Sequence, residues 1–244
     1  SLAIKILRQG FYWPTMKGDA FKFAKACDKC QRFANYSHSP VTNLTPLVSP
    51  WPFAMWGIDL IGELPTAKGG VKYAVVAVDY FTKWAEAAPL ATITAGKIKS
   101  FVFNSIVCRF GVPYKLISDN EKQFDSKELG RMCEELGIRR DFAAVYHPQS
   151  NGQTEAVNKI IKHTLKAKLD EKKGCWPDEL PLVLWSYNTT PRTTTGESPF
   201  SMTYGCEAMV PVEVGAGSFR RSNFDEKSNE VTMRLHLDLI EEAR

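Results

Sequence analysis

Apolar and polar positions in the first half of the chain alternate or cluster in the way that is typical of strands. Three such runs predict strands at 55–61, 72–80 and 83–89. The run at 72–80 is almost continuously apolar, which predicts a strand buried inside a sheet. Gly69 and Gly70, between the first two runs, favour the tight turn of a hairpin.

After residue 94 the apolar spacing becomes helical until Gly111 and Pro113, which end the predicted helix. The remaining pattern predicts a strand at 114–118, a helix at 126–136, a strand at 139–142, helices at 152–169 and 177–187, and a last helical segment near 235–239. Three strands in succession, followed by alternating helices and strands, imply an α/β fold with a mixed five-stranded sheet and helices on both faces.

The two ends of the chain differ from this middle region. Residues 1–35 predict two short helices around a turn, and residues 36–52 are rich in Ser, Thr, Asn and Pro, which predicts a linker. We therefore expect a helical segment at 1–35, a linker at 36–52, the α/β domain at 53–200 and a C-terminal extension at 201–244. The chain begins with Ser and enters directly into a helical pattern, so we expect it to be part of a longer protein.

Composition narrows the class of protein. The 244 residues are 44% hydrophobic and 24% charged, which is typical of a globular chain and excludes a peptide toxin or a disordered tail. No apolar run approaches the roughly 20 residues of a membrane span, and no leader is visible, so neither membrane insertion nor secretion is expected. The six Cys are irregularly spaced, which argues against a disulfide framework. The net charge of +4 is too small to indicate a polyanionic partner by itself.

Three acidic residues lie at positions that often carry catalytic or ligand-binding groups, although each also has a simpler structural explanation. Asp59 lies inside the first predicted strand, where a carboxylate loses solvation unless it is paired, exposed on one sheet face or bound to metal. Asp119 follows a strand end, where open sheets bind ligands, but Asp-Asn is also good turn chemistry. Glu155 begins a long helix and can simply complement the helix dipole. Taken singly, each residue favours the structural explanation.

Together, the three carboxylates can converge on divalent metal ions. Hard oxygen ligands that leave water positions open suit Mg²⁺ or Mn²⁺. Two such ions stabilise the attacking and leaving oxygens of a phosphoryl displacement, which is nuclease or transesterase chemistry. The 35 residues between Asp119 and Glu155 do not decide the matter, because a chain with sixteen Glu contains about one such spacing by chance.

Five separate motifs give these residues a context. They are Cys27-Asp28-Lys29-Cys30, Trp56-Gly57-Ile58-Asp59, Ile117-Ser118-Asp119-Asn120, His147-Pro148-Gln149-Ser150-Asn151-Gly152-Gln153-Thr154-Glu155 and Tyr187-Asn188-Thr189-Thr190-Pro191. In this order, over about residues 1–215, they resemble the integrases of long-terminal-repeat retrotransposons, most closely the Ty3/gypsy group of plants. The resemblance implies an RNase H-like catalytic core with a D,D(35)E triad, preceded by a zinc-binding domain of the His-His-Cys-Cys type.

The resemblance also assigns residues to the site. Asp59, Asp119 and Glu155 are the implied catalytic metal ligands, for two Mg²⁺ or Mn²⁺ ions. The loop at 146–153 and the helix after it are the implied contacts with the DNA end, and the DNA-binding candidates are Tyr146, Gln149, Asn151, Asn158, Lys159 and Lys162. Both lysines stand on the helix face of Glu155, where they would meet phosphates, and a solvated helix face is the alternative.

Cys27 and Cys30 have the spacing of half a zinc site, and structural zinc takes four ligands. The resemblance places the missing His pair upstream of Ser1. Residues 1–35 are therefore interpreted as a partial zinc-binding domain that holds Zn²⁺ only if that pair is present, and a Cys pair at a helix end is the alternative. Core packing is expected for the other four Cys and for three rings, those of Trp56, Trp84 and Trp185.

Two positions depart from the family pattern. Glu121 occupies a position where the family usually has Gly, which adds a negative charge and a Cβ two residues from Asp119; it could perturb metal binding or only extend a solvated turn. Glu63 replaces a common Pro and is a milder departure. No pattern of a small β-barrel or chromodomain follows residue 215, so 201–244 is interpreted as the start of a linker to a further domain.

The leading hypothesis is an integrase, a polynucleotidyl transferase that processes element ends and joins them to host DNA without a covalent enzyme intermediate. The implied partners are double-stranded DNA and further copies of the chain, and the substrate implies the nucleus. One alternative is an inactive or domesticated relic that binds DNA or protein. Another is an RNase H-like nuclease that cleaves RNA–DNA hybrids, against which the 35-residue spacing and the Cys pair argue.

Overall fold

The computed structural model describes residues 2–28, 31, 49–142, 152–169, 174–192, 195–216 and 222–243. Contacts between residues divide the chain into two compact units, Pro40–Asn188 and a second unit that combines Ser1–Ser39 with Thr189–Arg244. The expected domain limits at residues 35, 52 and 200 stay predictions.

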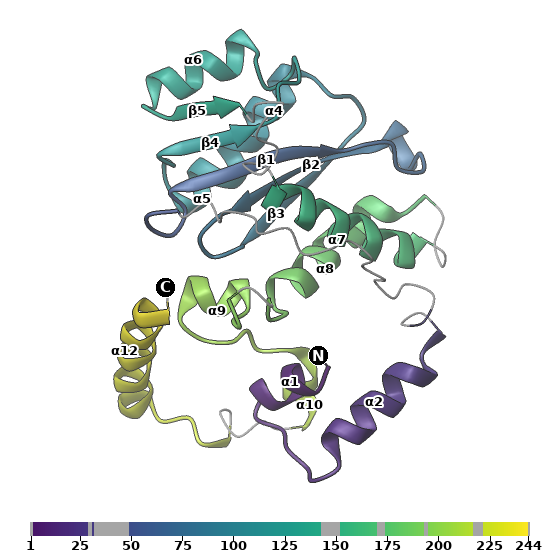
Figure 1. Cartoon of the computed structure of the whole chain (residues 1–244), viewed down its shortest axis with the longest axis vertical. Helices are drawn as coiled ribbons and strands as arrows, with labels where there is room; N and C mark the ends of the chain where they lie inside the picture. Colours follow the sequence, from purple (N-terminus) through teal and green to yellow (C-terminus); the bar gives the residue numbers. More distant parts are fainter. Residues whose placement is uncertain are drawn as a thin grey trace. The chain divides into compact units, whose positions relative to one another are not determined.

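The larger unit is built on a five-stranded sheet (Figure 1). Its strands are β1 (Met55–Ile61), β2 (Tyr73–Asp79), β3 (Ala85–Leu90), β4 (Lys115–Ser118) and β5 (Arg139–Phe142). The order is β3-β2-β1-β4-β5, with antiparallel pairing from β3 to β1 and parallel pairing from β1 to β5. This arrangement confirms the mixed five-stranded sheet implied by the order of predicted elements. The predicted turn is also present, as the short 3-10 turn η1 (Lys68–Gly70).

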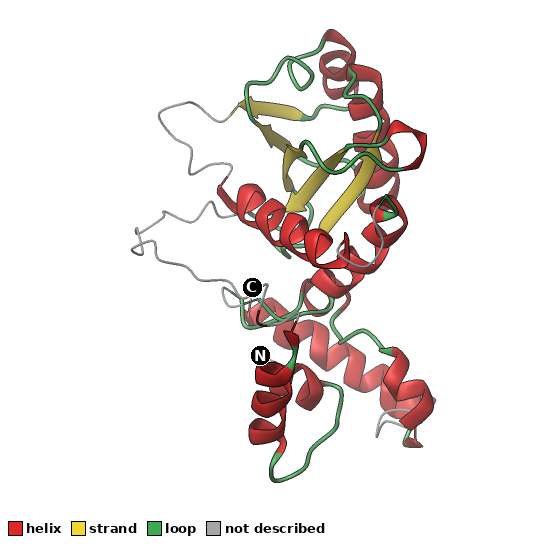
Figure 2. Ribbon diagram, turned by 90° about the vertical axis from the view of Figure 1, so that its right-hand side faces the viewer, coloured by secondary structure: helices red, strands yellow, loops and turns green. Residues whose placement is uncertain are grey.

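Helices cover both faces of the sheet (Figure 2). The helix α7 (Gly152–Leu169) packs on β1 and β2, and α8 (Trp176–Asn188) packs on β3. Between β3 and β4 the chain forms α4 (Ala95–Phe101), η2 (Val102–Val107) and α5 (Cys108–Phe110), and α6 (Lys127–Glu135) connects β4 to β5. The single helix predicted after residue 94 is therefore interrupted by a π-helical turn, η2.

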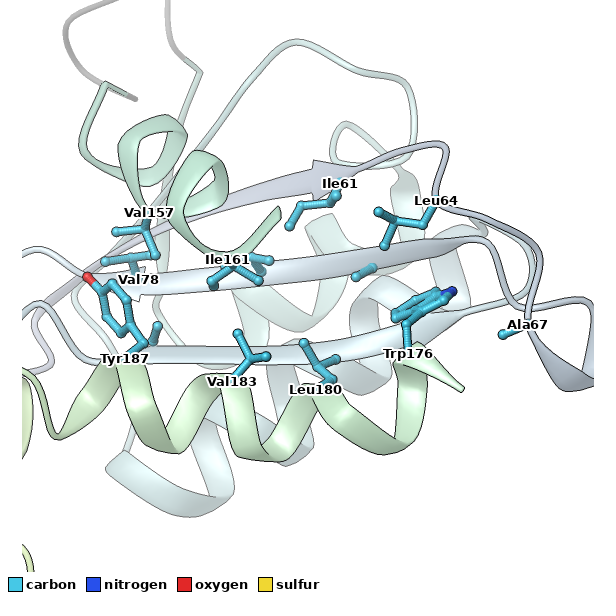
Figure 3. Close-up of a cluster of buried hydrophobic side chains, with 13 residues drawn as sticks. Ile61, Leu64, Ala67, Val78, Val157, Ile161, Trp176, Leu180, Val183 and Tyr187 are labelled. Atoms are coloured by element: carbon cyan, nitrogen blue, oxygen red, sulfur yellow. The ribbon is translucent and has the colours of Figure 1, made fainter. Parts of the chain in front are cut away.

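An extensive apolar cluster lies between the sheet and helices α7 and α8 (Figure 3). It joins one face of β2 to Val157 and Ile161 of α7 and to Trp176, Leu180 and Val183 of α8, all nearly inaccessible to solvent. Burial of each large apolar side chain contributes about 1.5–3 kcal/mol. The cluster thus holds α7, the helix that carries residue 155, firmly on the sheet.

Capping side chains and glycines set helix ends close to their predicted positions. Ser126 precedes α6, and its Oγ accepts a hydrogen bond from the backbone N–H of Leu129 at 3.3 Å. Gly137 follows α6 with φ 69°, and Gly111 ends α5 with φ 89°, a backbone conformation that favours glycine. The bounds of α7 agree with the predicted helix at 152–169.

The smaller unit contains α1 (Leu2–Arg8), α2 (Met16–Ala26), α9 (Pro199–Tyr204), α10 (Pro211–Ala216) and α12 (Glu226–Ala243). Arg8 pairs with Glu197 at 2.6 Å and with Glu207 at 2.8 Å, which ties α1 to the segments on either side of α9. The first two helices match the prediction, whereas the sequence predicts neither α9 nor α10 and starts the last helix too late. No described helix in either unit is both long and apolar enough to cross a membrane.

Three side chains contradict the expectation of core packing. Cys108 and Cys175 are exposed, whereas Cys133 is buried. The ring of Trp56 is buried, but Trp185 is 40% exposed. The prediction is therefore wrong for the two exposed Cys and for Trp185, because a folded surface always retains some apolar side chains.

Candidate active site

Parallel pairing of β1 with β4 brings the first two predicted carboxylates together. Gly57 pairs with Ile117 in this register, so Asp59 and Asp119, each two residues further along, stand at neighbouring positions. Asp119 is the first residue after β4, which ends at Ser118. The structure thus places one Asp within a strand and the other at the carboxyl end of the adjacent strand, as the sequence predicts.

Helix α7 is seated directly on β1 beside Asp59. A Cβ at Gly57 would lie 2.0 Å from Thr154 Oγ1 and 2.4 Å from the Tyr80 hydroxyl oxygen. Thr154 is fully buried, and its Oγ1 is 3.3 Å from the Tyr80 hydroxyl. Only glycine allows the helix and the strand to approach this closely. Because Thr154 immediately precedes Glu155, this contact sets the distance between the α7 backbone at residue 155 and strand β1.

One side chain of α7 contacts Asp59 directly. Asn158 Nδ2 donates to Asp59 Oδ2 at 2.6 Å, and the backbone N–H of Leu60 donates to Asp59 Oδ1 at 2.7 Å. Asn158 is only 7% exposed, and its Oδ1 is buried without a hydrogen-bond partner. A buried oxygen without a hydrogen bond costs folding free energy. The Oδ1 of Asn158 is therefore an acceptor that is available to a ligand beside the Asp59 carboxylate. The predicted role of Asn158 in DNA binding stays a prediction.

A third acidic side chain lies next to Asp119. The backbone N–H of Glu121 donates to Asp119 Oδ1 at 3.3 Å. Burial raises the pKa of Asp119, and hydrogen bonds from Glu121 partly oppose the rise. Burial also raises the pKa of Glu121, and the negative charges of Asp119 and Asp59 raise it further. The three carboxyl groups therefore lie within electrostatic range of one another.

The chemistry of these groups fits a hard divalent cation. Two carboxylates on adjacent strands and a neighbouring amide oxygen are the kinds of ligand that Mg²⁺ and Mn²⁺ prefer. The side chain of Glu155, the third predicted ligand, lies outside the described residues. Among the side chains that are described, no three His, Cys, Asp or Glu already have the geometry to hold a metal. Asp59 and Asp119 are thus the part of the predicted triad that the structure places.

The other predicted site residues fall into two groups. Tyr146, Gln149 and Asn151 lie outside the described residues, as does Cys30, the second predicted zinc ligand. Three others are described and can be placed: Cys27 is half-buried after α2, Lys159 is exposed, and Lys162 Nζ donates to the Gly62 carbonyl at 3.4 Å. Their roles in binding zinc or DNA stay predictions.

Two features of the site are not found from the sequence. The first is the seat of α7 on Gly57, for which a glycine inside a strand pattern is the available signal. The second is the contact of Asn158 with Asp59, which joins residues 99 positions apart and has no local signal.

Comparison with known proteins places this geometry in a family. Residues 50–148 match the integrase core domain, and residues 3–36 match the integrase zinc binding domain. A Gag-Pol polyprotein of avian reticuloendotheliosis virus is 37% identical over 164 residues, which cover 67% of this chain and 14% of the relative. The chain belongs to the retroelement integrases. The match to both domains confirms the resemblance on which the sequence interpretation rests.

This integrase also matches a retrotransposon protein over almost its whole length. The transposon Tf2-3 polyprotein of Schizosaccharomyces pombe is 27% identical over 242 residues, which cover 97% of the chain and 18% of the relative. The integrase thus spans less than a fifth of the length of either of these curated relatives.

Solved structures support the fold. The integrase matches a chain of the simian T-cell lymphotropic virus intasome, determined with a regulatory subunit of PP2A, with a TM-score of 0.59 at 20% identity, covering 86% of this chain and 79% of that one. It matches the HTLV-2 integrase catalytic core, determined with magnesium, with a TM-score of 0.52 at 20% identity, covering 63% and 98%. These matches confirm the predicted RNase H-like integrase fold.

Proposed function

We propose that this integrase processes the 3′ ends of element DNA and transfers them into chromosomal DNA. Its cation ligands in this proposal are Asp59, Asp119 and Glu155. The observation that carries the proposal is the pairing of β1 with β4, which sets Asp59 beside Asp119 while α7 is seated on the same strand. Fold and family support the general class of polynucleotidyl transferase.

Each element of the site has a separate task in this proposal. The strand register fixes the separation of the two Asp, and Asn158 orients the Asp59 carboxylate by donating to one of its oxygens. Two divalent cations, when bound there, would neutralise charge at the scissile phosphate and activate water or a 3′-hydroxyl. Lys159, exposed on α7, is available to a DNA phosphate. No side chain is required as a covalent nucleophile.

The partners follow from the same proposal. We propose double-stranded DNA from the element ends and the host as substrates, with the nucleus as the place of reaction. The simian viral structure is an intasome and the HTLV-2 core is described as trimeric, which supports assembly of several copies on DNA. We further propose that Cys27 and Cys30 bind Zn²⁺ together with two His from the preceding part of the protein.

A joining assay tests the proposed reaction. The full chain is incubated with Mn²⁺ and a labelled duplex that carries an element end, and joined products are separated by size. Asp119→Asn is expected to abolish joining while DNA binding in a gel shift persists. Asp125→Asn is the matched control, because Asp125 lies in the same loop and its carboxylate is 62% exposed. Joining by the Asp119→Asn variant would remove that residue from the mechanism.

A second candidate is a relic that binds DNA without joining it. The observation in its favour is Glu121, which sets an additional carboxyl beside Asp119. The same assay separates the two candidates. A gel shift by the unaltered chain, with no joined product under any divalent cation, would favour the relic.

A further inference from the structure

One buried side chain, that of Tyr80, lies among the three elements that carry the proposed cation ligands. Tyr80 is the first residue after β2 and is only 1% exposed. Its backbone N–H donates to the Met55 carbonyl at 2.9 Å, which extends the antiparallel pairing of β1 and β2 by one residue. The backbone of Tyr80 is therefore fixed at the edge of the paired strands.

The ring of Tyr80 crosses β1 at Gly57 and reaches α7. A Cβ at Gly57 would lie 2.4 Å from the Tyr80 hydroxyl oxygen and 2.5 Å from Tyr80 Cε1, so the ring occupies the space that another side chain would fill. The Tyr80 hydroxyl and Thr154 Oγ1 share a hydrogen bond at 3.3 Å. Because Thr154 is fully buried, its hydroxyl depends on this partner and not on bulk water.

The same ring is also packed with β4. Tyr80 belongs to a buried apolar cluster that includes Ile117, which stands two residues before Asp119. The contacts of Tyr80 on β1 and α7 lie at similar places, two residues and one residue before the proposed ligands of those elements. One side chain thus joins the three elements close to all three proposed ligands.

We propose that Tyr80 is a positioning residue for the joining reaction. Its hydroxyl holds the first turn of α7 at the distance from β1 at which residue 155 completes the site with Asp59 and Asp119. The inference rests on the proposed function, because it concerns the same carboxylates. Tyr80 is buried and acts through Thr154, so it sets geometry without binding DNA. Small displacements of catalytic groups lower the rate of a reaction more than they lower substrate affinity.

Kinetics of joining by the full chain, with Mn²⁺ and a duplex that carries an element end, test this inference. Tyr80→Phe keeps the ring and removes the hydroxyl, so kcat is expected to fall about tenfold while the KM for DNA stays unchanged. Thr154→Val removes the other hydroxyl and should lower kcat equally. Thr154→Ser retains a hydroxyl and should keep most of the activity. The double variant of Tyr80→Phe with Thr154→Val should be no slower than either single variant, because each removes the same hydrogen bond.

Tyr73→Phe is the matched control. Tyr73 stands at the opposite end of β2, and its hydroxyl donates to Glu63 Oε1 at 2.8 Å, away from α7. Its removal is expected to leave kcat and KM unchanged. Thermal melting of every variant verifies that the chain is folded, so kcat is compared between folded proteins.

Hydrogen exchange without DNA or metal provides a second measurement that does not depend on activity. Backbone amides at 156–159, in the first turn of α7, are expected to exchange about tenfold faster in Tyr80→Phe than in the unaltered chain. Exchange in this turn should be unchanged in Tyr73→Phe. The measurement reports whether the Tyr80 hydroxyl holds the helix, whatever reaction the site performs.

The outcomes distinguish this inference from the proposed function. Joining by the unaltered chain together with an unchanged kcat in Tyr80→Phe would overturn the inference and keep the proposed function, even if the variant melted at a lower temperature. Unchanged exchange at 156–159 in Tyr80→Phe would also overturn the inference. Faster exchange in Tyr80→Phe, with no joining by the unaltered chain, would overturn the proposed function and support the hold of Tyr80 on α7.

Discussion

Two sets of carboxylates in the larger unit, one buried and one partly exposed, are built in opposite ways. Asp79, fully buried, accepts hydrogen bonds from Phe53 N at 3.1 Å, from Thr82 N at 2.8 Å and from Thr82 Oγ1 at 2.7 Å. Asp119, by contrast, accepts a weak hydrogen bond from Glu121 N at 3.3 Å, and the negative charges of Asp119 and Asp59 raise the pKa of Glu121 beside it. The first set closes the turn between β2 and β3, and the second leaves negative charge uncompensated at a strand end.

Glu86 belongs with Asp79. Trp84 Nε1 donates to one of its oxygens at 2.8 Å, and the Arg109 guanidinium donates to the other at 2.6 Å. A carboxylate whose oxygens are all occupied by protein donors is part of the fold. A carboxylate whose neighbours are other carboxylates has its negative charge compensated only when a cation binds. This difference separates structural from functional acids in this chain.

The largest effect that separates the two sets is expected at Asp79. Asp79→Ala leaves three buried donors without an acceptor, each costing about 1 kcal/mol or more, so the free energy of unfolding should fall by about 3 kcal/mol or more. Urea denaturation of the full chain measures the loss. Asp119→Ala is the control and should change stability by less than about 0.5 kcal/mol. Similar losses in the free energy of unfolding of the two variants would contradict the distinction between structural and functional carboxylates.

The seat of α7 on β1 is the next most sensitive point, because it joins the functional set to the core. Gly57→Ala places a Cβ 2.0 Å from Thr154 Oγ1 and should cost about 1–3 kcal/mol through overpacking. Joining activity should fall as well, because the helix moves away from Asp59. Gly18→Ala in α2, where a Cβ meets no atom within 4 Å, is the control and should not destabilise the chain. A fully active Gly57→Ala variant would contradict the described seat.

The two sets also differ in how far the sequence reveals them. Asp59 and Asp119 could be located because the motifs around them resemble those of a known family; the strand around Asp59 and the turn after Asp119 would each favour a structural explanation on their own. The contact of Thr154 with Gly57 could not, because it depends on how α7 crosses the sheet and not on local pattern. The same holds for the donors around Asp79: Phe53 N comes from the segment before β1, and the two donors of Thr82 come from a turn with Lys83 at φ 64° that no residue preference predicts.

Fold prediction failed where periodicity was ambiguous. The π-helical turn Val102–Val107 carries an apolar spacing that also suits an α-helix, so the sequence does not reveal it. The helices α9 and α10 have six residues each and begin at Pro199 and Pro211, so they are too short to show a helical period. The size of the Trp185 ring favours burial, but α8 turns that position toward solvent.

A moderate effect is expected when two buried amides in the described part of the larger unit, Asn158 and Asn188, are compared. Asn188 donates to the Ala85 carbonyl and accepts from the Ala85 N–H, both at 3.0 Å, whereas Asn158 leaves Oδ1 unpaired. Asn158→Ala should therefore cost only about 1 kcal/mol of stability but lower joining about 10- to 100-fold, because Asp59 loses its orienting donor. Asn188→Ala should show the larger loss of stability in urea. A reversed order would place Asn158 in the structural set.

The smallest expected effect is the pH dependence of stability without metal. Burial raises the pKa of Asp119 above its ordinary value of 3.8, so the folded state binds more protons than the unfolded state at mildly acidic pH. Stability is therefore lost as pH rises from about 3.8 through the folded pKa. Asp119→Asn should remove this loss and raise the melting temperature at pH 7 in EDTA. The gain should stay below about 1 kcal/mol, because partial exposure screens the charge.

Asp141 provides the control of opposite sign for this measurement. Burial opposes ionisation there, but the hydrogen bond and charge of Lys115, together with Arg139, lower the pKa of Asp141. Its contribution to stability is therefore present above 3.8 and is lost as pH falls through the folded pKa. Asp141→Asn should melt below the unaltered chain at pH 7, whereas Asp119→Asn should melt above it, and both differences should vanish at low pH. If both variants shifted the melting curve in the same direction, the charge environments of the two carboxylates would not differ as the structure indicates.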